Sequence, residues 1–163
     1  MESSVDGVAM GDLNGKITYV NKAFVRMFGY SKEELIGKEI AFIWSEDEIP
    51  GLKEAIKATM EGSWTGELIG KRKDGELFPV AVSSSRVMDD KGNVIAIMAN
   101  HRDITERKKR EQLQHDENYV LTLLGQGAEL SELLDAIVRL GEYHDPSIKG
   151  SVLLFDPSRE YLV

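Results

Sequence analysis

The stretch from residue 64 to residue 105 constrains the fold more than any other part of the chain. Three runs rich in Val, Ile and Leu alternate there with short polar turns, and these runs are residues 65–71, 77–88 and 94–102. The turns contain Asp74 with Gly75 and Gly92 with Asn93, which supply the positive φ angles that tight hairpins need. We therefore predict a meander of three antiparallel strands with short connections.

In the middle run, alternate side chains fall on opposite faces of the predicted strand. One face carries Phe78, Val80, Val82 and Ser84. Because this face is mainly apolar, we expect the residues that precede the meander to cover it.

The preceding segment predicts a hairpin and then a helix. Residues 5–12 and 16–20 are short apolar or alternating runs on either side of an Asn-Gly turn signal. Asn21 is placed to cap a helix that runs to about Phe28 and ends at Gly29.

Two pairs of residues have the spacing of a capping box. Ser31 with Glu34 precedes a short helix at about 32–36, and Ser45 with Glu48 suggests a second box. The longest helix of this half is expected to begin at residue 49 or 51 and to end at about residue 60. Its apolar stripe consists of Leu52, Ile56 and Met60.

A hairpin, several helices and three further strands predict an α+β fold, with a five-stranded antiparallel sheet and its helices on one face. The order and spacing of four stretches resemble the PAS sensory domain family, in the variety that carries a PAC motif. The stretches are DGVAMGDLNGKITYVNKAF, MFGYSKEELIGKEI, GSWTGELIGKRKDGELFPVAV and the terminal RDIT. The resemblance covers residues 5–105 and implies a PAS sensory domain at residues 1–104.

After residue 104 the composition changes to good helix formers, and we predict a signalling or linker helix at residues 105–127. Leu113, Val120 and either Leu123 or Leu124 approximate a heptad seam over about two repeats.

Residues 128–163 predict a second, different unit. We expect an amphipathic helix from about Glu129 to Gly141, a polar turn around residues 144–146 and a short strand at 151–155. This order resembles the start of a GAF domain, so we interpret the segment as an incomplete GAF-like α/β segment. That family's fold needs more residues than follow here, which implies a truncated domain.

Charge and composition exclude several classes of function. A net charge of -8 argues against nucleic-acid binding and against direct contact with an anionic membrane. The chain has no cysteine, which excludes disulfides, thiolate metal sites and cysteine nucleophiles. Its apolar runs stay below the roughly 20 residues of a membrane span. We expect a cytoplasmic protein, with any membrane anchor of the parent outside this segment.

PAS domains use the space between the sheet and the helices as a sensor pocket, so the resemblance implies a ligand pocket. Its expected lining is Leu52, Ile56, Met60, Val80, Val82, Ser84, Ile97, Ala99 and His101. The alternative is that the apolar members only form a packed core. Ser84 differs because a buried hydroxyl needs a partner, which could be a ligand, a water molecule or a main-chain carbonyl.

The resemblance also bears on cofactors. Haem-binding members carry an axial histidine on the long helix, and residues 49–60 contain none, which argues against haem. A cysteinyl-flavin adduct is excluded because the chain lacks cysteine. A non-covalent flavin, stacked on Trp44 or Trp64, and a small metabolite both stay open. The three histidines lack metal-ligand spacing, so no metal site is predicted.

Two polar residues at the end of the meander have predicted roles. His101 is expected to titrate near neutral pH if it lies partly buried beside Asp103. By resemblance, Asp103 ties the exit of the sheet to the core, with Lys71, Arg72 or Lys73 as its partner. The expected signal relay comprises Arg72, Asp103, Ile104 and Thr105.

Together these features predict a non-catalytic input module of a bacterial or archaeal signal-transduction protein, whose output is a histidine kinase, a diguanylate cyclase or a transcription regulator. Its expected partners are a second copy of itself and the downstream output domain. No phosphate-binding glycine loop or activated nucleophile suggests an enzyme. The alternative is a PAS module that binds no ligand and serves as a dimerisation spacer.

Overall fold

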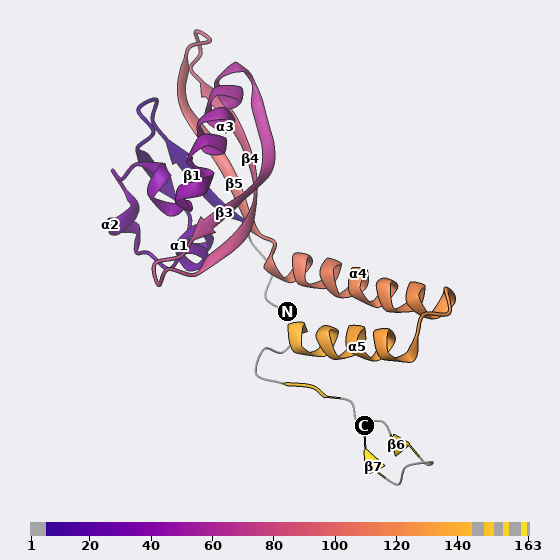
Figure 1. Ribbon diagram of the computed structural model, residues 1–163. Helices are drawn as coiled ribbons and strands as arrows, with labels where there is room; N and C mark the ends of the chain where they lie inside the picture. The colour runs from indigo at the N-terminus through magenta and orange to yellow at the C-terminus, as the bar shows by residue number, and fades with distance from the viewer. Residues whose placement is uncertain (1–5, 145–148, 152–154, 157–160, 163) are drawn as a thin grey trace. The chain divides into compact units, whose positions relative to one another are not determined.

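The computed structural model describes residues 6–144, 149–151, 155–156 and 161–162 (Figure 1). The chain divides into two compact units, Met1–Glu106 and Arg107–Val163, and each is described by itself.

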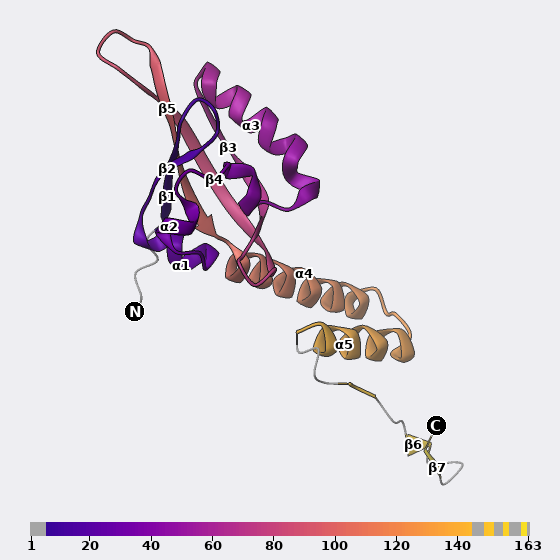
Figure 2. The same ribbon diagram turned by 90° about the vertical axis from the view of Figure 1, so that its left-hand side faces the viewer.

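The first unit is built on a five-stranded antiparallel sheet in the order β2-β1-β5-β4-β3 (Figure 2). Its strands are β1 (Gly7–Gly11), β2 (Ile17–Val20), β3 (Ser63–Lys71), β4 (Leu77–Met88) and β5 (Val94–Asp103). The meander β3-β4-β5 pairs strand to strand as predicted, and β1 closes the sheet by pairing with β5. The predicted α+β sheet of five strands is confirmed.

The helices of this unit all lie between β2 and β3. They are α1 (Lys22–Phe28), α2 (Lys32–Leu35), the 3-10 turns η1 (Ile40–Ile43) and η2 (Glu46–Glu48), and α3 (Ile49–Glu61). Asn21 caps α1 as predicted, because its Oδ1 accepts from the Phe24 amide at 2.8 Å. Ser31 and Glu34 form the predicted capping box of α2.

The second predicted capping box is wrong. Ser45 makes no side-chain cap to η2, and its amide instead donates to the Ile69 carbonyl of β3 at 3.0 Å. The neighbouring Trp44 forms a β-bridge with Gly70. This segment is therefore held against the edge strand, and α3 begins after it with proline in its first turn.

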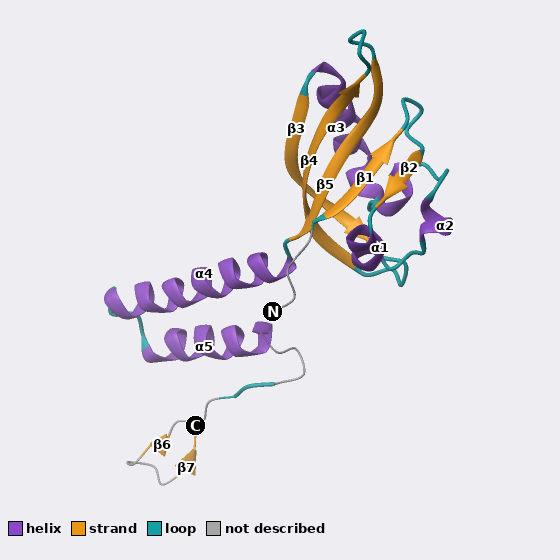
Figure 3. Ribbon diagram, turned by 180° about the vertical axis from the view of Figure 1, so that it is seen from behind, coloured by secondary structure: helices purple, strands orange, loops and turns teal. Residues whose placement is uncertain are grey.

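One face of the sheet is buried beneath the helices, as the alternation along β4 predicted. Phe78, Val80, Val82 and Ser84 of β4 are all buried. Seen from behind, the strands lie in front of α3 (Figure 3). The core that joins the two layers contains Phe24, Phe28, Leu35, Ile43, Trp44 and Leu52 from the helical side.

The second unit contains most of α4 (Thr105–Gly125), α5 (Leu130–His144) and two short paired strands, β6 (Phe155–Asp156) and β7 (Tyr161–Leu162). Of the two leucines that could complete the predicted heptad seam, Leu123 is buried and Leu124 is exposed. Gly141 does not end α5, because its φ is not positive and the helix continues to residue 144. The strand expected at 151–155 and the turn at 144–146 lie largely outside the described residues.

Candidate functional site

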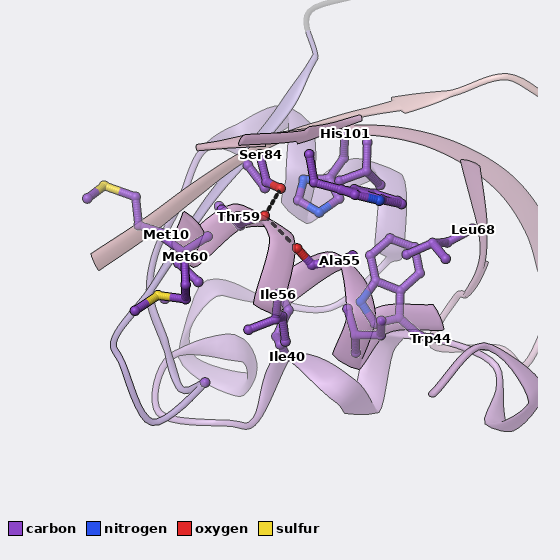
Figure 4. A pocket seen from close by; sticks show the side chains of 18 of the residues that line it. Met10, Ile40, Trp44, Ala55, Ile56, Thr59, Met60, Leu68, Ser84 and His101 are labelled. Atoms are coloured by element: carbon purple, nitrogen blue, oxygen red, sulfur yellow. Dashed lines mark hydrogen bonds between the residues drawn. The ribbon is translucent and has the colours of Figure 1, made fainter. Parts of the chain in front are cut away.

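A cavity of about 160 Å³ lies between α3 and the sheet of the first unit (Figure 4). Small side chains create this space. Ala9 of β1 pairs with Ala99 of β5, and Ala99 pairs on its other side with Ser84 of β4. Ala55 of α3 also lines the cavity. Three neighbouring strands therefore present short side chains at one place, and α3 cannot fill the gap they leave.

Eight of the nine residues predicted to line a pocket do line this cavity. They are Leu52, Ile56, Met60, Val82, Ser84, Ile97, Ala99 and His101. Val80 is the exception. It pairs with Asp103 at the other end of β5 and is fully buried in the core. The predicted lining did not include Ala9, Ala55 or Thr59, because small side chains on a buried face give the same sequence signal as ordinary core. Trp44 and Trp64 were named only as stacking partners for a flavin, and both line the cavity.

The two hydroxyl groups of the cavity satisfy each other. Thr59 Oγ1 donates to the Ala55 carbonyl at 2.7 Å, and Thr59 Oγ1 and Ser84 Oγ lie 2.6 Å apart. Because a carbonyl only accepts, the single Thr59 proton goes to Ala55 and Ser84 donates to Thr59. The partner of Ser84 is therefore a side-chain hydroxyl, which was not among the three partners expected.

Trp44 is a core residue with one unsatisfied group. Its side chain is 2% exposed, and its indole stacks on the His101 ring with centroids 5.8 Å apart. Among the described residues, Trp44 Nε1 has no hydrogen-bond partner. Trp64 also lines the cavity, and its ring lies so close to Gly66 that a Cβ there would be 2.4 Å from it.

His101 does not titrate near neutral pH, contrary to the expectation from the sequence. It is 2% exposed, and burial lowers its pKa to about 4, against the opposing effect of its bond to the Gly7 carbonyl. That bond is 3.3 Å from Nδ1, which places the ring proton on Nδ1 because a carbonyl cannot donate. Asp103 is not its partner, since the Asp103 carboxylate bonds to Arg72 and Thr105.

Arg72 is the partner of Asp103 among the three basic residues considered. Its Nη2 donates to Asp103 Oδ2 at 2.6 Å, its Nε donates to Glu76 at 2.8 Å, and its Nη1 donates to the Met27 carbonyl. The guanidinium also lies over the Phe78 ring at 3.6 Å from its centroid. One side chain thus joins the end of α1, the β3–β4 turn and the end of β5.

Asp103 organises the residues that follow β5. Its Oδ1 accepts from the Thr105 amide at 2.9 Å and from the Thr105 hydroxyl at 2.6 Å. Ile104 between them is buried, and its amide donates to the Pro79 carbonyl. Burial acts to raise the pKa of Asp103, but the bonds from Thr105 and Arg72 outweigh it and lower the pKa below its usual value.

Within the described residues, no group of three or more His, Cys, Asp and Glu side chains is placed to hold a metal ion. No described helix has both the length and the apolar character needed to cross a membrane.

Comparison with known proteins places these features in a family. Residues 5–106 match the family described as "PAS domain". The chain is 26% identical over 140 residues to a blue-light-activated histidine kinase of Rhizobium johnstonii, and the match covers 84% of this chain and 41% of the kinase.

Solved structures share the fold. The PAS domain of a protein from Colwellia psychrerythraea has a TM-score of 0.60 and 26% identity, covering 62% of this chain and 87% of that one. A Light-Oxygen-Voltage domain studied with a flavin analogue has a TM-score of 0.57 and 24% identity, covering 70% of this chain and 88% of that one.

Proposed function

Because the chain belongs to the PAS domain family, we propose that its first unit senses a small molecule for a larger signal-transduction protein. The cavity between α3 and the sheet carries this proposal. The interior of a folded domain is normally packed about as densely as an organic crystal. Three small side chains on adjacent strands leave the cavity open, which suits a site that a ligand completes.

The network at the end of the sheet supports a route for the signal. His101 lines the cavity and lies two residues before Asp103 on the same strand. Asp103 in turn binds Thr105, the first residue of α4. A ligand that moves β5 would change the bonds of Asp103 and so bias the start of α4. A signal of this kind requires α4 to have two arrangements of similar free energy.

We further propose a histidine kinase as the output domain of the parent protein, in preference to a diguanylate cyclase or a transcription regulator. The support is the similarity to the Rhizobium johnstonii histidine kinase, of which the chain spans less than half. The match to that kinase covers 140 residues and therefore extends beyond the PAS segment. For residues 128–163 we retain the start of a GAF-like domain as the proposed identity, on the pattern of one amphipathic helix followed by short strands.

The cavity fits a small metabolite better than a flavin. Its volume of about 160 Å³ is close to that of an engineered cavity that binds benzene, about 150 Å³. Sites for larger ligands measure roughly 300–1,000 Å³. The indole of Trp44 already stacks on His101, so one of its faces is not free for a flavin ring.

A second candidate is a spacer that dimerises without a ligand. Exposed apolar side chains on α4 and α5 favour it, because such groups seek a partner surface. They are Tyr119, Leu121, Leu124, Leu130 and Ile137. A homodimer formed through these helices is compatible with both candidates.

Native mass spectrometry and an absorbance spectrum of the same purified chain test the sensory function. We expect an extra mass that is lost on denaturation, or a rise in melting temperature with at least one member of a panel of small metabolites. A clean apo mass with no thermal response to the panel would favour the spacer. Absorbance above the aromatic band would identify a flavin or haem and contradict the size argument.

A further inference from the structure

The unsatisfied indole nitrogen of Trp44 indicates what the cavity binds. A buried donor without a partner has lost its hydrogen bond to water and gained none in return, so native structures contain few of them. Trp44 lines the cavity and its Nε1 is buried with no partner among the described residues. In Figure 4 the nitrogen lies on the edge of the indole that is turned toward Ala55 and Ile56.

The polar side chains nearby have other hydrogen-bond partners. The Thr59 proton goes to Ala55, and the Ser84 proton goes to Thr59. Asp12 lines the cavity as well, but its Oδ1 accepts from the amides of Asn14 and Lys16 in the β1–β2 turn. None of these groups is bonded to the Trp44 nitrogen.

A water molecule is a poor partner at this place. A buried water needs two to four polar neighbours, and cavities lined by apolar side chains stay dry. Around Trp44 the lining is mainly aliphatic, including Ile40, Leu52, Ile56 and Leu68. An acceptor that brings its own apolar body satisfies the nitrogen and the aliphatic wall together.

The lining also disfavours a negatively charged ligand. Among the described lining residues there is no lysine or arginine, and His101 is held neutral by burial, with its pKa lowered to about 4. An anionic ligand would therefore be desolvated without a counter-ion, which is strongly unfavourable.

We propose that the cavity binds an uncharged molecule of about one ring whose carbonyl, ether or hydroxyl oxygen accepts the Trp44 Nε1 proton. This rests on the proposed sensory function and narrows its ligand. The indole stacks on His101 of β5, so the residue that recognises the ligand also contacts the strand that leads to Asp103.

Two probes of equal heavy-atom number test this on the 163-residue chain. Cyclohexanone carries a carbonyl acceptor, and methylcyclohexane has none. NMR of the ¹⁵N-labelled protein follows the Trp44 indole proton and the amides of Ala55 and Ala99. We expect Trp44→Phe to weaken the binding of cyclohexanone about tenfold and to leave that of methylcyclohexane unchanged. In the wild-type chain, cyclohexanone should shift the Trp44 indole proton downfield. Benzoate should bind more weakly than either.

The comparison is made within each probe, because methylcyclohexane is the more hydrophobic of the two. If Trp44→Phe loses its folded spectrum, the shift of the indole proton in the wild-type chain decides alone. An equal loss of affinity for both probes, or an unshifted indole while the amides of Ala55 and Ala99 move, would overturn the role of Trp44 and leave the sensory cavity standing. Failure of both probes to move any of these signals would count against the sensory function too.

Discussion

A neutral histidine inside an aromatic cluster is the most distinctive single residue of the molecule. The His101 ring packs edge to face on Phe24 with centroids 4.9 Å apart, and it stacks on Trp44. Its environment penalises the imidazolium, because burial removes water from the charged ring and no carboxylate among the described residues is bonded to it. Protonation of His101 therefore opposes folding.

The sign of the pH effect follows from the lowered pKa of His101. Its ordinary pKa is 6.5 and the folded pKa is about 4, so the unfolded chain binds the proton first and stability falls as pH drops from about 6.5 to 4. The loss should be roughly 3 kcal/mol at the lower limit. Urea unfolding of the wild-type chain and of His101→Phe at pH 7 and pH 4.5 measures it.

The His101→Phe variant should be less stable than wild type at pH 7, because the Gly7 bond is lost, yet less sensitive to acid. A parallel loss of stability in both proteins between these pH values would show that His101 does not titrate in this range.

At the scale of elements, the β3–β4 turn fastens the helical segment to the sheet. Lys73 of this turn pairs with Glu34 at 2.6 Å, and its amide donates to the Phe28 carbonyl. Arg72 reaches Met27 and Asp103. Two adjacent side chains therefore hold α1, α2 and β5 in one arrangement.

Replacement of Arg72 should loosen the start of α4. Arg72→Lys keeps the charge, but an ammonium cannot reproduce the forked contacts with Asp103, Glu76 and Met27. We expect a loss of about 2 kcal/mol in unfolding free energy and faster hydrogen exchange at Ile104 and Thr105.

The variant Lys73→Gln is the matched control, because Lys73 is the next residue of the same turn and its ion pair is exposed. It should leave exchange at Ile104 and Thr105 unchanged. If both variants accelerate exchange equally, the effect belongs to the turn as a whole and not to the Arg72–Asp103 contact.

The carboxylate of Asp103 predicts a second dependence on pH. Its pKa is lowered in the folded state, so the carboxylate stabilises the fold at pH values above its ordinary pKa of 3.8. This stabilisation is lost as the pH falls through the pKa of the folded state. Asp103→Asn should keep the fold and destabilise it by about 1 kcal/mol at pH 7, with the difference from wild type shrinking below pH 4. A constant difference from pH 7 to pH 3 would contradict the role of its charge.

The elements were predictable from sequence where one local rule decided them. Alternation along residues 77–88 defined β4 and its buried face, and Asn21 and Ser31 defined the helix starts. The Ser45 box failed because a long-range pairing with β3 competed for that segment. The cavity could not be predicted in detail, since its volume depends on which small residues become neighbours across strands, as Ala9 and Ala99 do.

At the scale of the whole molecule, we expect the cavity to allow a ligand to bind and, at the same time, to lower the stability of the fold. Ala55→Leu on α3 places a larger side chain in the cavity, and filling such a space commonly adds roughly 0.5–2 kcal/mol. We expect this variant to melt at a higher temperature and to lose binding of cyclohexanone. Ala58→Leu, on the same helix and outside the lining, is the control and should retain binding. A stabilised Ala55→Leu that still binds would place the ligand elsewhere.

The pairing of β1 with β5 also governs how the chain can acquire its structure during synthesis. Gly7 and His101 contact each other although they are 94 positions apart, so the hairpin β1–β2 leaves the ribosome long before its main neighbour exists. Contacts of such separation fold slowly, because the intervening chain must be ordered before they form. A nascent chain that has not yet exposed β5 therefore carries an incomplete sheet with open edges, and chaperones that protect such edges would act on it at this stage.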